Sequence, residues 1–124
     1  MDNFLGPADR HTAPVADATD LEQLRAGMRA FVEERDWSSF HDPKSVLIAM
    51  VGEVGELAEL VQWLPADEVV ERARDAGLRG RLGEEMSDVL LYLVLLADVL
   101  GIDLGRAAAA KLAAAHLKHP APGA

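Results

Sequence analysis

Two stretches of this 124-residue chain decide its fold: VGEVGELAEL at residues 51–60 and GEEMSDVLLY at residues 83–92. Each stretch contains two carboxylates spaced i, i+3 within an otherwise apolar run. In a helix, this spacing puts both carboxylates on one face, about 5–6 Å apart. The two stretches therefore predict two helices, each carrying an acidic pair beside a hydrophobic seam. The pairs are Glu53 with Glu56 and Glu85 with Asp88.

Four carboxylates beside a hydrophobic seam repel one another and lose hydration, which is unfavourable unless a cation compensates them. Mg²⁺ prefers oxygen ligands of this kind, and Mn²⁺ is a possible substitute. A single i, i+3 pair of acids is better explained as an exposed feature of an ordinary helix. Two pairs on consecutive apolar helices, with no basic residue within a turn, favour a metal site. If these helices pack antiparallel, Glu53, Glu56, Glu85 and Asp88 converge on one point.

The composition restricts the class of protein. Half the residues are hydrophobic, aromatic residues are few, and no alternating Val/Ile/Thr-rich segment is present, which favours one globular all-α domain. The net charge of −9 argues against a nucleic-acid polymer as partner, because phosphate backbones require a basic surface. The longest apolar run, residues 89–100, is interrupted by Asp98 and is too short to span a membrane. The N-terminus lacks signal-peptide features, so we expect a cytoplasmic protein.

Capping signals divide the chain into a flexible N-terminal tail at 1–18, an all-α domain at 19–119 and a C-terminal tail at 120–124. Thr19 with Glu22 predicts a capping box, and Asp42 followed by Pro43 predicts a second helix start. Gly101 closes the third long helix, and Asp103 caps the last. The expected elements are long helices at about 20–35, 42–63, 78–100 and 103–119, a short helix at 66–77, and a loop at 36–41.

The third long helix is apolar on nearly every side from Val89 to Ile102. A helix of this kind must be buried all round. A monomer of 124 residues can hardly cover it, so we expect a four-helix-bundle-like fold that forms an obligate homo-oligomer with a shared core. The alternative is a monomer with one apolar central helix. On the second helix, the wheel directs Val54, Leu57 and Val61 into the core, with Glu53 and Glu56 beside them.

The chain resembles a known family, the MazG-like all-α nucleoside triphosphate pyrophosphohydrolases, and most closely their dCTP pyrophosphatase branch. Glu53-x-x-Glu56 followed by Glu85-x-x-Asp88 matches the E-x-x-E…E-x-x-D signature of the family. The resemblance covers about residues 20–120 and is specific because several further blocks match together. These blocks are ERDW at 34–37, FHDP at 40–43, QW at 62–63 and EEMSDVLLY at 84–92.

The resemblance implies a Mg²⁺-dependent enzyme that cleaves a nucleoside triphosphate between its α- and β-phosphates, giving a monophosphate and pyrophosphate. Its metal ligands match the four acids named above, and either Glu53 or Glu56 is the candidate base. A homo-tetramer is favoured over a dimer, because tetramers are usual in the closest branch. Positions that line the base and sugar pocket match Trp37, His41, Trp63 and Tyr92, and Lys111 matches a phosphate-binding lysine.

Each pocket residue also has an ordinary structural explanation. Trp37 and Trp63 fit amphipathic positions at helix ends, although their rings are equally suited to stacking on a base. His41 fits a local loop contact or a hydrogen bond to a pyrimidine or sugar. Tyr92 fits the core, but its position one turn from Asp88 favours the pocket.

The last helix departs from the family pattern. Ala115 stands where the family has asparagine, and Lys118-His119-Pro120 replaces Arg-Tyr-Pro. Phosphate contacts are therefore weaker, rerouted through His116 or Lys118, or supplied by another subunit.

The sequence supports hydrolysis of dCTP or a modified pyrimidine deoxynucleotide. The alternatives are a related enzyme for dUTP or a damaged purine nucleotide, or a non-catalytic helical assembly module that binds a structural cation. A di-iron bundle is disfavoured, because neither acidic pair contains the expected histidine.

Overall fold

The computed structural model describes residues 20–123, apart from the side chain of Phe40, and its regular elements in this range are all helical. The prediction of an all-α fold is therefore confirmed. The predicted tail at residues 1–18 lies outside the described residues, and the division into a domain and two tails stays a prediction. In chain order the elements are α1 (Leu21–Glu34), the 3₁₀ helix η1 (Ser38–Phe40), α2 (Pro43–Glu59), the 3₁₀ helix η2 (Ala66–Glu68), α3 (Val69–Arg72), α4 (Ala76–Leu100) and α5 (Leu104–Lys118).

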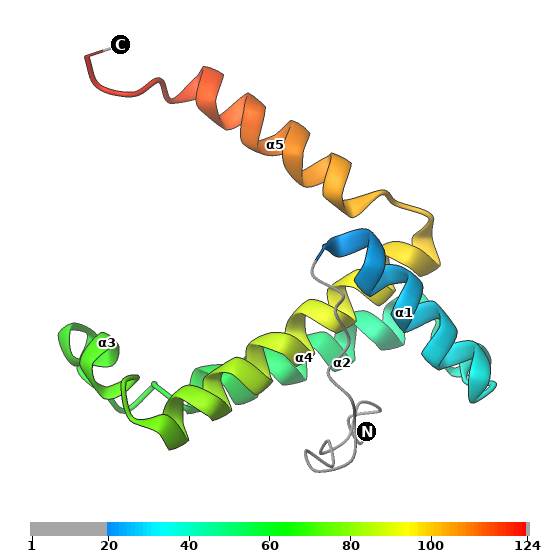
Figure 1. Ribbon diagram of the computed structural model, residues 1–124, viewed down its shortest axis with the longest axis horizontal. Coiled ribbons are helices and arrows are strands. Elements are labelled where there is room, and N and C mark those ends of the chain that lie inside the picture. The colour runs from blue at the N-terminus through cyan, green and yellow to red at the C-terminus, as the bar shows by residue number, and fades with distance from the viewer. Residues whose placement is uncertain (1–19, 124) are drawn as a thin grey trace.

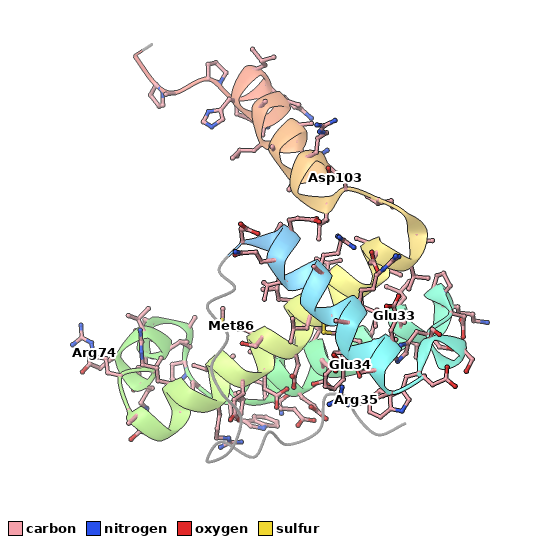
Figure 2. The ribbon with its side chains drawn as sticks, turned by 45° about the vertical axis from the view of Figure 1, so that its right-hand side comes forward. Glu33, Glu34, Arg35, Arg74, Met86 and Asp103 are labelled. Atoms are coloured by element: carbon pink, nitrogen blue, oxygen red, sulfur yellow. The ribbon has the colours of Figure 1, made fainter. Side chains whose placement is uncertain are left out.

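Several helix ends lie where local side-chain chemistry predicts them. The carboxylate of Asp42 accepts a hydrogen bond of 2.9 Å from the backbone N–H of Ser45, and Pro43 takes the first position of α2. Asp103, labelled at the start of α5 in Figure 2, caps that helix in the same way. Gly101 ends α4 with a left-handed φ of 68°, which glycine adopts without a steric penalty.

Three predicted boundaries are wrong. The capping box of α1 is formed by Asp20 and Gln23, so the cap is one residue after Thr19, which lies outside the described residues. α2 ends at Glu59 rather than Trp63, because tight turns replace the helical bonding pattern from Leu60 onward. The expected short helix at 66–77 is divided, because Asp75 caps α4 and brings Gly77 into its first turn.

The core forms where α1 and α2 pack against α4. α2 and α4 lie side by side and run antiparallel, and α1 crosses α4 (Figure 1). Asp98 of α4 also binds two cations of α1, with distances of 2.9 Å to Arg25 and 3.0 Å to Arg29. These ion pairs explain why a charged residue is found within the apolar run of α4: Asp98 joins α4 to α1. The buried side chains of the central cluster are Met28, Val32, Val46, Tyr92 and Leu95.

A single chain does not cover all of its apolar surface. α4 buries Val94 and Leu95 but leaves Leu90 and Leu93 partly open. α5 projects away from the other helices and contains no buried residue (Figure 1). Within residues 20–123, none of the helices has both the length and the hydropathy needed to cross a bilayer.

The C-terminal cap of α4 gives a direct test of this fold. Replacing Gly101 with alanine forces a Cβ into a left-handed conformation and should lower the free energy of unfolding by about 1 kcal/mol. The matched control is Gly80→Ala in the interior of α4, where no atom obstructs a Cβ, and it should stabilise the protein by about 0.5–1 kcal/mol. Urea unfolding of both variants measures the difference, and effects of the same sign would contradict this account of the cap.

Candidate active site

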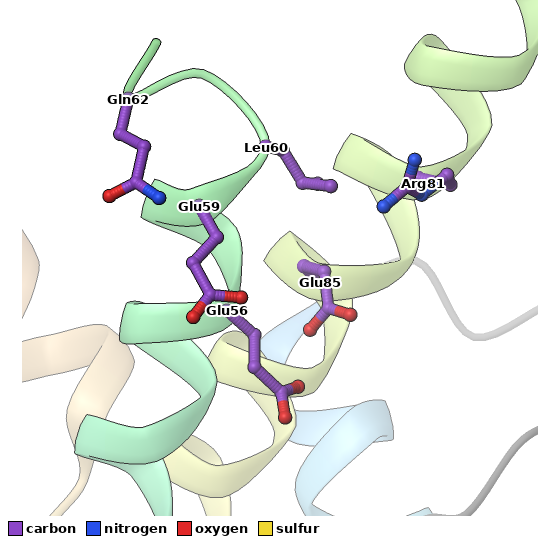
Figure 3. Close-up of a pocket in the computed structure, with 6 residues that line it drawn as sticks. All are labelled: Glu56, Glu59, Leu60, Gln62, Arg81 and Glu85. Carbon is purple, nitrogen blue, oxygen red and sulfur yellow. The ribbon is translucent and has the colours of Figure 1, made fainter.

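Three of the four predicted metal ligands meet between α2 and α4. One carboxylate oxygen each from Glu53, Glu56 and Glu85 lies within 4.8 Å of the other two. Figure 3 shows Glu56 and Glu85 approaching each other from neighbouring helices. Asp88, one turn further along α4, lies outside this group, although its negative charge contributes to the raised pKa of both Glu53 and Glu85. The antiparallel packing of the two helices therefore brings the acids together.

The orientation of α2 differs from the helical-wheel prediction. Val54 was expected in the core but is 45% exposed, whereas the side chain of Glu53 is 4% exposed. The helical-wheel prediction is wrong for Val54, because α2 is rotated so that Glu53 rather than Val54 faces α4. As a result, a carboxylate is the buried polar group of α2 at its contact with α4.

Burial strongly perturbs the ionisation of the cluster. It raises the pKa of Glu53 to about 8, with further contributions from hydrogen bonding to Glu56 and Glu85 and from nearby negative charge. Burial is also the main reason that the pKa of Glu85 is raised. These shifts mean that the site resists carrying its full negative charge unless a cation is present.

Two oxygens of the cluster have unmet bonding capacity. The Oε2 atoms of Glu53 and Glu85 are buried and find no hydrogen-bond partner in the described part of the chain. Buried acceptors normally have a donor or a cation beside them. Converging carboxylate oxygens are the donor set of a hard divalent cation, so the residues fit a metal ion.

Two hollows flank the acids and follow one another along α2. We call them the Arg81 hollow, of about 640 Å³, and the Tyr92 hollow, of about 320 Å³. Glu56 borders both. The Arg81 hollow is lined by Glu56, Glu59, Leu60, Gln62, Arg81 and Glu85 (Figure 3). The Tyr92 hollow is lined by Ser45, Ile48, Ala49, Gly52, Glu53, Glu56 and Tyr92.

The structure separates the predicted nucleotide-binding residues. Tyr92 is almost completely buried and borders a hollow beside the acids. Trp37 is half-buried and makes an edge contact with Phe31, and His41 is half-buried with a pKa lowered by burial. Trp63 is 86% exposed in the turn after α2, and Lys111 is exposed on α5, which projects away from α2 and α4 (Figure 1).

Arg81 is a residue that the sequence prediction missed. It lies four residues before Glu85, just beyond one helical turn, and was not included among the predicted site residues. The i, i+4 spacing puts both side chains on one face of α4, and this signal was present in the sequence. Glu59 is a further acid beside the cluster. It is exposed, but it lines the same hollow as Arg81.

The fold and the site define an all-α protein with a carboxylate cluster suited to a divalent metal ion. The sequence model of the MazG nucleotide pyrophosphohydrolase domain family matches residues 41–121. The chain therefore belongs to this family. The sequence-based prediction of the family and of its enzyme class, nucleoside triphosphate pyrophosphohydrolase, is confirmed. Members of the family depend on a metal ion, which agrees with the cluster of Glu53, Glu56 and Glu85.

Relatives and a solved structure agree on this assignment. The chain is 41% identical to dCTP pyrophosphatase 1 of Bos taurus, over 93% of this chain and 69% of that protein. It is 46% identical to dCTP pyrophosphatase 1 of Rattus norvegicus, over 81% of this chain, and spans only 59% of that relative's length. A pyrophosphatase from Archaeoglobus fulgidus has the same fold, with a TM-score of 0.73 and 32% identity over 88% of this chain and all of that chain.

The raised pKa of Glu53 predicts how stability depends on pH. Without metal, the folded protein retains a proton that the unfolded chain releases above its ordinary pKa of 4.5. This contribution to stability is complete below pH 4.5 and is lost as the pH rises towards about 8. Thermal unfolding in EDTA should therefore show a melting temperature that falls across this range, and Mg²⁺ should restore more stability at pH 8 than at pH 5.

Glu53→Gln should flatten this pH dependence, because the amide does not ionise. The control is Glu33→Gln, an exposed acid on α1 (Figure 2), which should leave the slope unchanged. A wild-type slope in Glu53→Gln would contradict the assignment.

Proposed function

We propose that this chain hydrolyses a nucleoside triphosphate between the α- and β-phosphates, releasing a monophosphate and pyrophosphate. The observation that carries the proposal is the cluster of Glu53, Glu56 and Glu85, with two buried oxygens that lack partners, in a chain of this family. Relatives named dCTP pyrophosphatase 1 support dCTP or a modified pyrimidine deoxynucleotide as the substrate. A cytoplasmic role in nucleotide pool sanitation stays a prediction.

Mg²⁺ is the proposed metal, with Mn²⁺ as a substitute. Glu53, Glu56 and Glu85 hold it, and Asp88 is the proposed fourth ligand. When bound, the ion supplies positive charge that stabilises the phosphate oxygens during hydrolysis.

Burial separates the roles of the two candidate bases. Glu53 is enclosed between α2 and α4, whereas Glu56 is exposed and borders both hollows. We assign to Glu56 the proton released by the attacking water, because its carboxylate is open to solvent beside the other acids. Glu53 and Glu85 then serve mainly as ligands.

The nucleoside is proposed to lie on the side of the Tyr92 hollow, which is next to the acids and partly lined by uncharged residues. Trp37 and His41 stay candidate contacts to the base and sugar. Trp63 and Lys111 are proposed to approach the bound nucleotide from another subunit of a homo-oligomer. We propose that this oligomer is a tetramer. Exposed apolar side chains on three helices support such an assembly. They include Ile48, Val51, Val54, Leu90, Leu93, Leu112 and Leu117.

A nucleotide panel tests the reaction. With Mg²⁺, dCTP or a 5-substituted analogue should release equimolar monophosphate and pyrophosphate, and excess EDTA should abolish the release. Chromatography of the products distinguishes this outcome from release of orthophosphate. Preference for dUTP or a purine nucleotide would keep the reaction and change the base assignment. Failure of the whole panel with Mg²⁺ and with Mn²⁺ would favour a non-catalytic metal-binding assembly.

The division of roles predicts distinct kinetic effects. Glu56→Gln should lower kcat by about 10²- to 10⁴-fold, the usual contribution of a general base, and should raise the Mg²⁺ concentration needed for half-maximal activity less than loss of Glu53 or Glu85 does. Glu53→Gln and Glu85→Gln should mainly raise that Mg²⁺ concentration. Glu33→Gln on α1 is the control for loss of one carboxylate. If all three site variants raise the Mg²⁺ requirement equally, Glu56 is a ligand rather than the base.

A further inference from the structure

Arg81 is a cation that lines an acidic hollow. It projects from α4 one turn before Glu85, and Figure 3 shows it across the Arg81 hollow from Glu59 and Gln62. Within residues 20–123 it makes no hydrogen bond or ion pair. By contrast, Arg25 and Arg29 on α1 are both bound to Asp98. The guanidinium of Arg81 is therefore available to a ligand that enters the hollow.

Within this acidic hollow, the guanidinium of Arg81 is the place where an anionic group can bind favourably. Three of its lining residues are acids, and Arg81 is the one cation among the described residues that line it. A divalent ion on the acids offsets part of the charge of a triphosphate, and the remaining phosphate oxygens need a second positive group. A guanidinium offers planar, paired N–H donors that match phosphate oxygens.

The order of the two hollows along α2 gives the substrate a direction. The Tyr92 hollow extends from the acids towards the N-terminal end of α2, and the Arg81 hollow extends towards its C-terminal end. A nucleoside on the Tyr92 side leaves its terminal phosphates on the Arg81 side, with the scissile bond beside Glu56.

We propose that Arg81 binds the β- and γ-phosphates, which leave as pyrophosphate, and thereby selects triphosphates over diphosphates. This inference rests on the proposed function and adds a substrate-binding residue to it. It also accounts for a departure in α5, where Ala115 provides no side-chain donor and the helix projects away from α2 and α4 (Figure 1). In this chain, α4 supplies a phosphate contact that the side chain at position 115 of α5 does not.

The first test measures binding without turnover. Inorganic pyrophosphate and dCMP, each with Mg²⁺, are titrated into the wild type, Arg81→Ala, Arg81→Lys and the control Arg79→Ala. Arg79 lies on the same helix but does not line the hollow. Arg81→Ala should weaken pyrophosphate binding by about 10- to 100-fold, the range for losing a hydrogen bond between charged groups. Binding of dCMP should change little, lysine should restore part of the loss, and Arg79→Ala should resemble the wild type.

The second test measures selectivity. The ratio of kcat/KM for dCTP to that for dCDP should fall in Arg81→Ala, because the lost contact involves the terminal phosphates. A purely structural role would reduce both values together and leave the ratio unchanged.

Three outcomes overturn the inference: no pyrophosphate binding by the wild type, wild-type binding by Arg81→Ala, or equal weakening of dCMP and pyrophosphate. If the wild type hydrolyses dCTP and Arg81→Ala matches it in both tests, the inference fails and the proposed function stands. If no nucleotide is hydrolysed but pyrophosphate binding still depends on Arg81, the function fails and the anion site stands.

Discussion

The enclosure of the Glu53 carboxylate between two antiparallel helices is the constraint on which the rest of the structure depends. Ionised and uncompensated, a carboxylate in this position would oppose the packing of α2 on α4, because both desolvation and neighbouring acids act against it. The apolar contacts of Val46, Tyr92 and Leu95 hold the helices together despite this cost. The helix pair therefore has uncompensated negative charge at its centre, which a proton or a metal ion must neutralise.

The remaining elements hold this pair in position. Asp98 fixes α1 to α4 through two arginines, on the part of α4 that follows the acids. The turns after α2 and the Asp75 cap reverse the chain, so that α4 returns with Glu85 opposite Glu56. Because Arg81 lies one turn before Glu85, the same reversal puts a cation at the far end of the acidic site.

Features encoded by residues a few positions apart were predictable from the sequence. Asp42, Gly101 and Asp103 specify helix ends through their own side chains or backbone freedom, and the i, i+3 acids specify a shared face. The end of α2 at Glu59 was not predictable, because no proline or glycine lies between Glu59 and Pro65. The buried face of α2 was not predictable either. Local spacing allows Val54 or Glu53 to face the core, and only the packing of α2 against α4 determines which of them is buried. Trp63 is exposed and lines neither hollow, and Lys111 lies on α5, which projects away from α2 and α4, so their predicted role is not visible in the described residues of one chain.

The same physics joins metal binding to protonation. A cluster that retains a proton near neutral pH must release it when a divalent cation takes the carboxylate oxygens, so metal uptake and deprotonation are one linked event. Burial, which makes the empty cluster unfavourable, also strengthens the attraction between its ionised oxygens and a cation, because little water screens them. The same arrangement of buried acids therefore has two effects. It destabilises the metal-free helix pair, and it provides the ligands that hold a metal ion beside a polyphosphate.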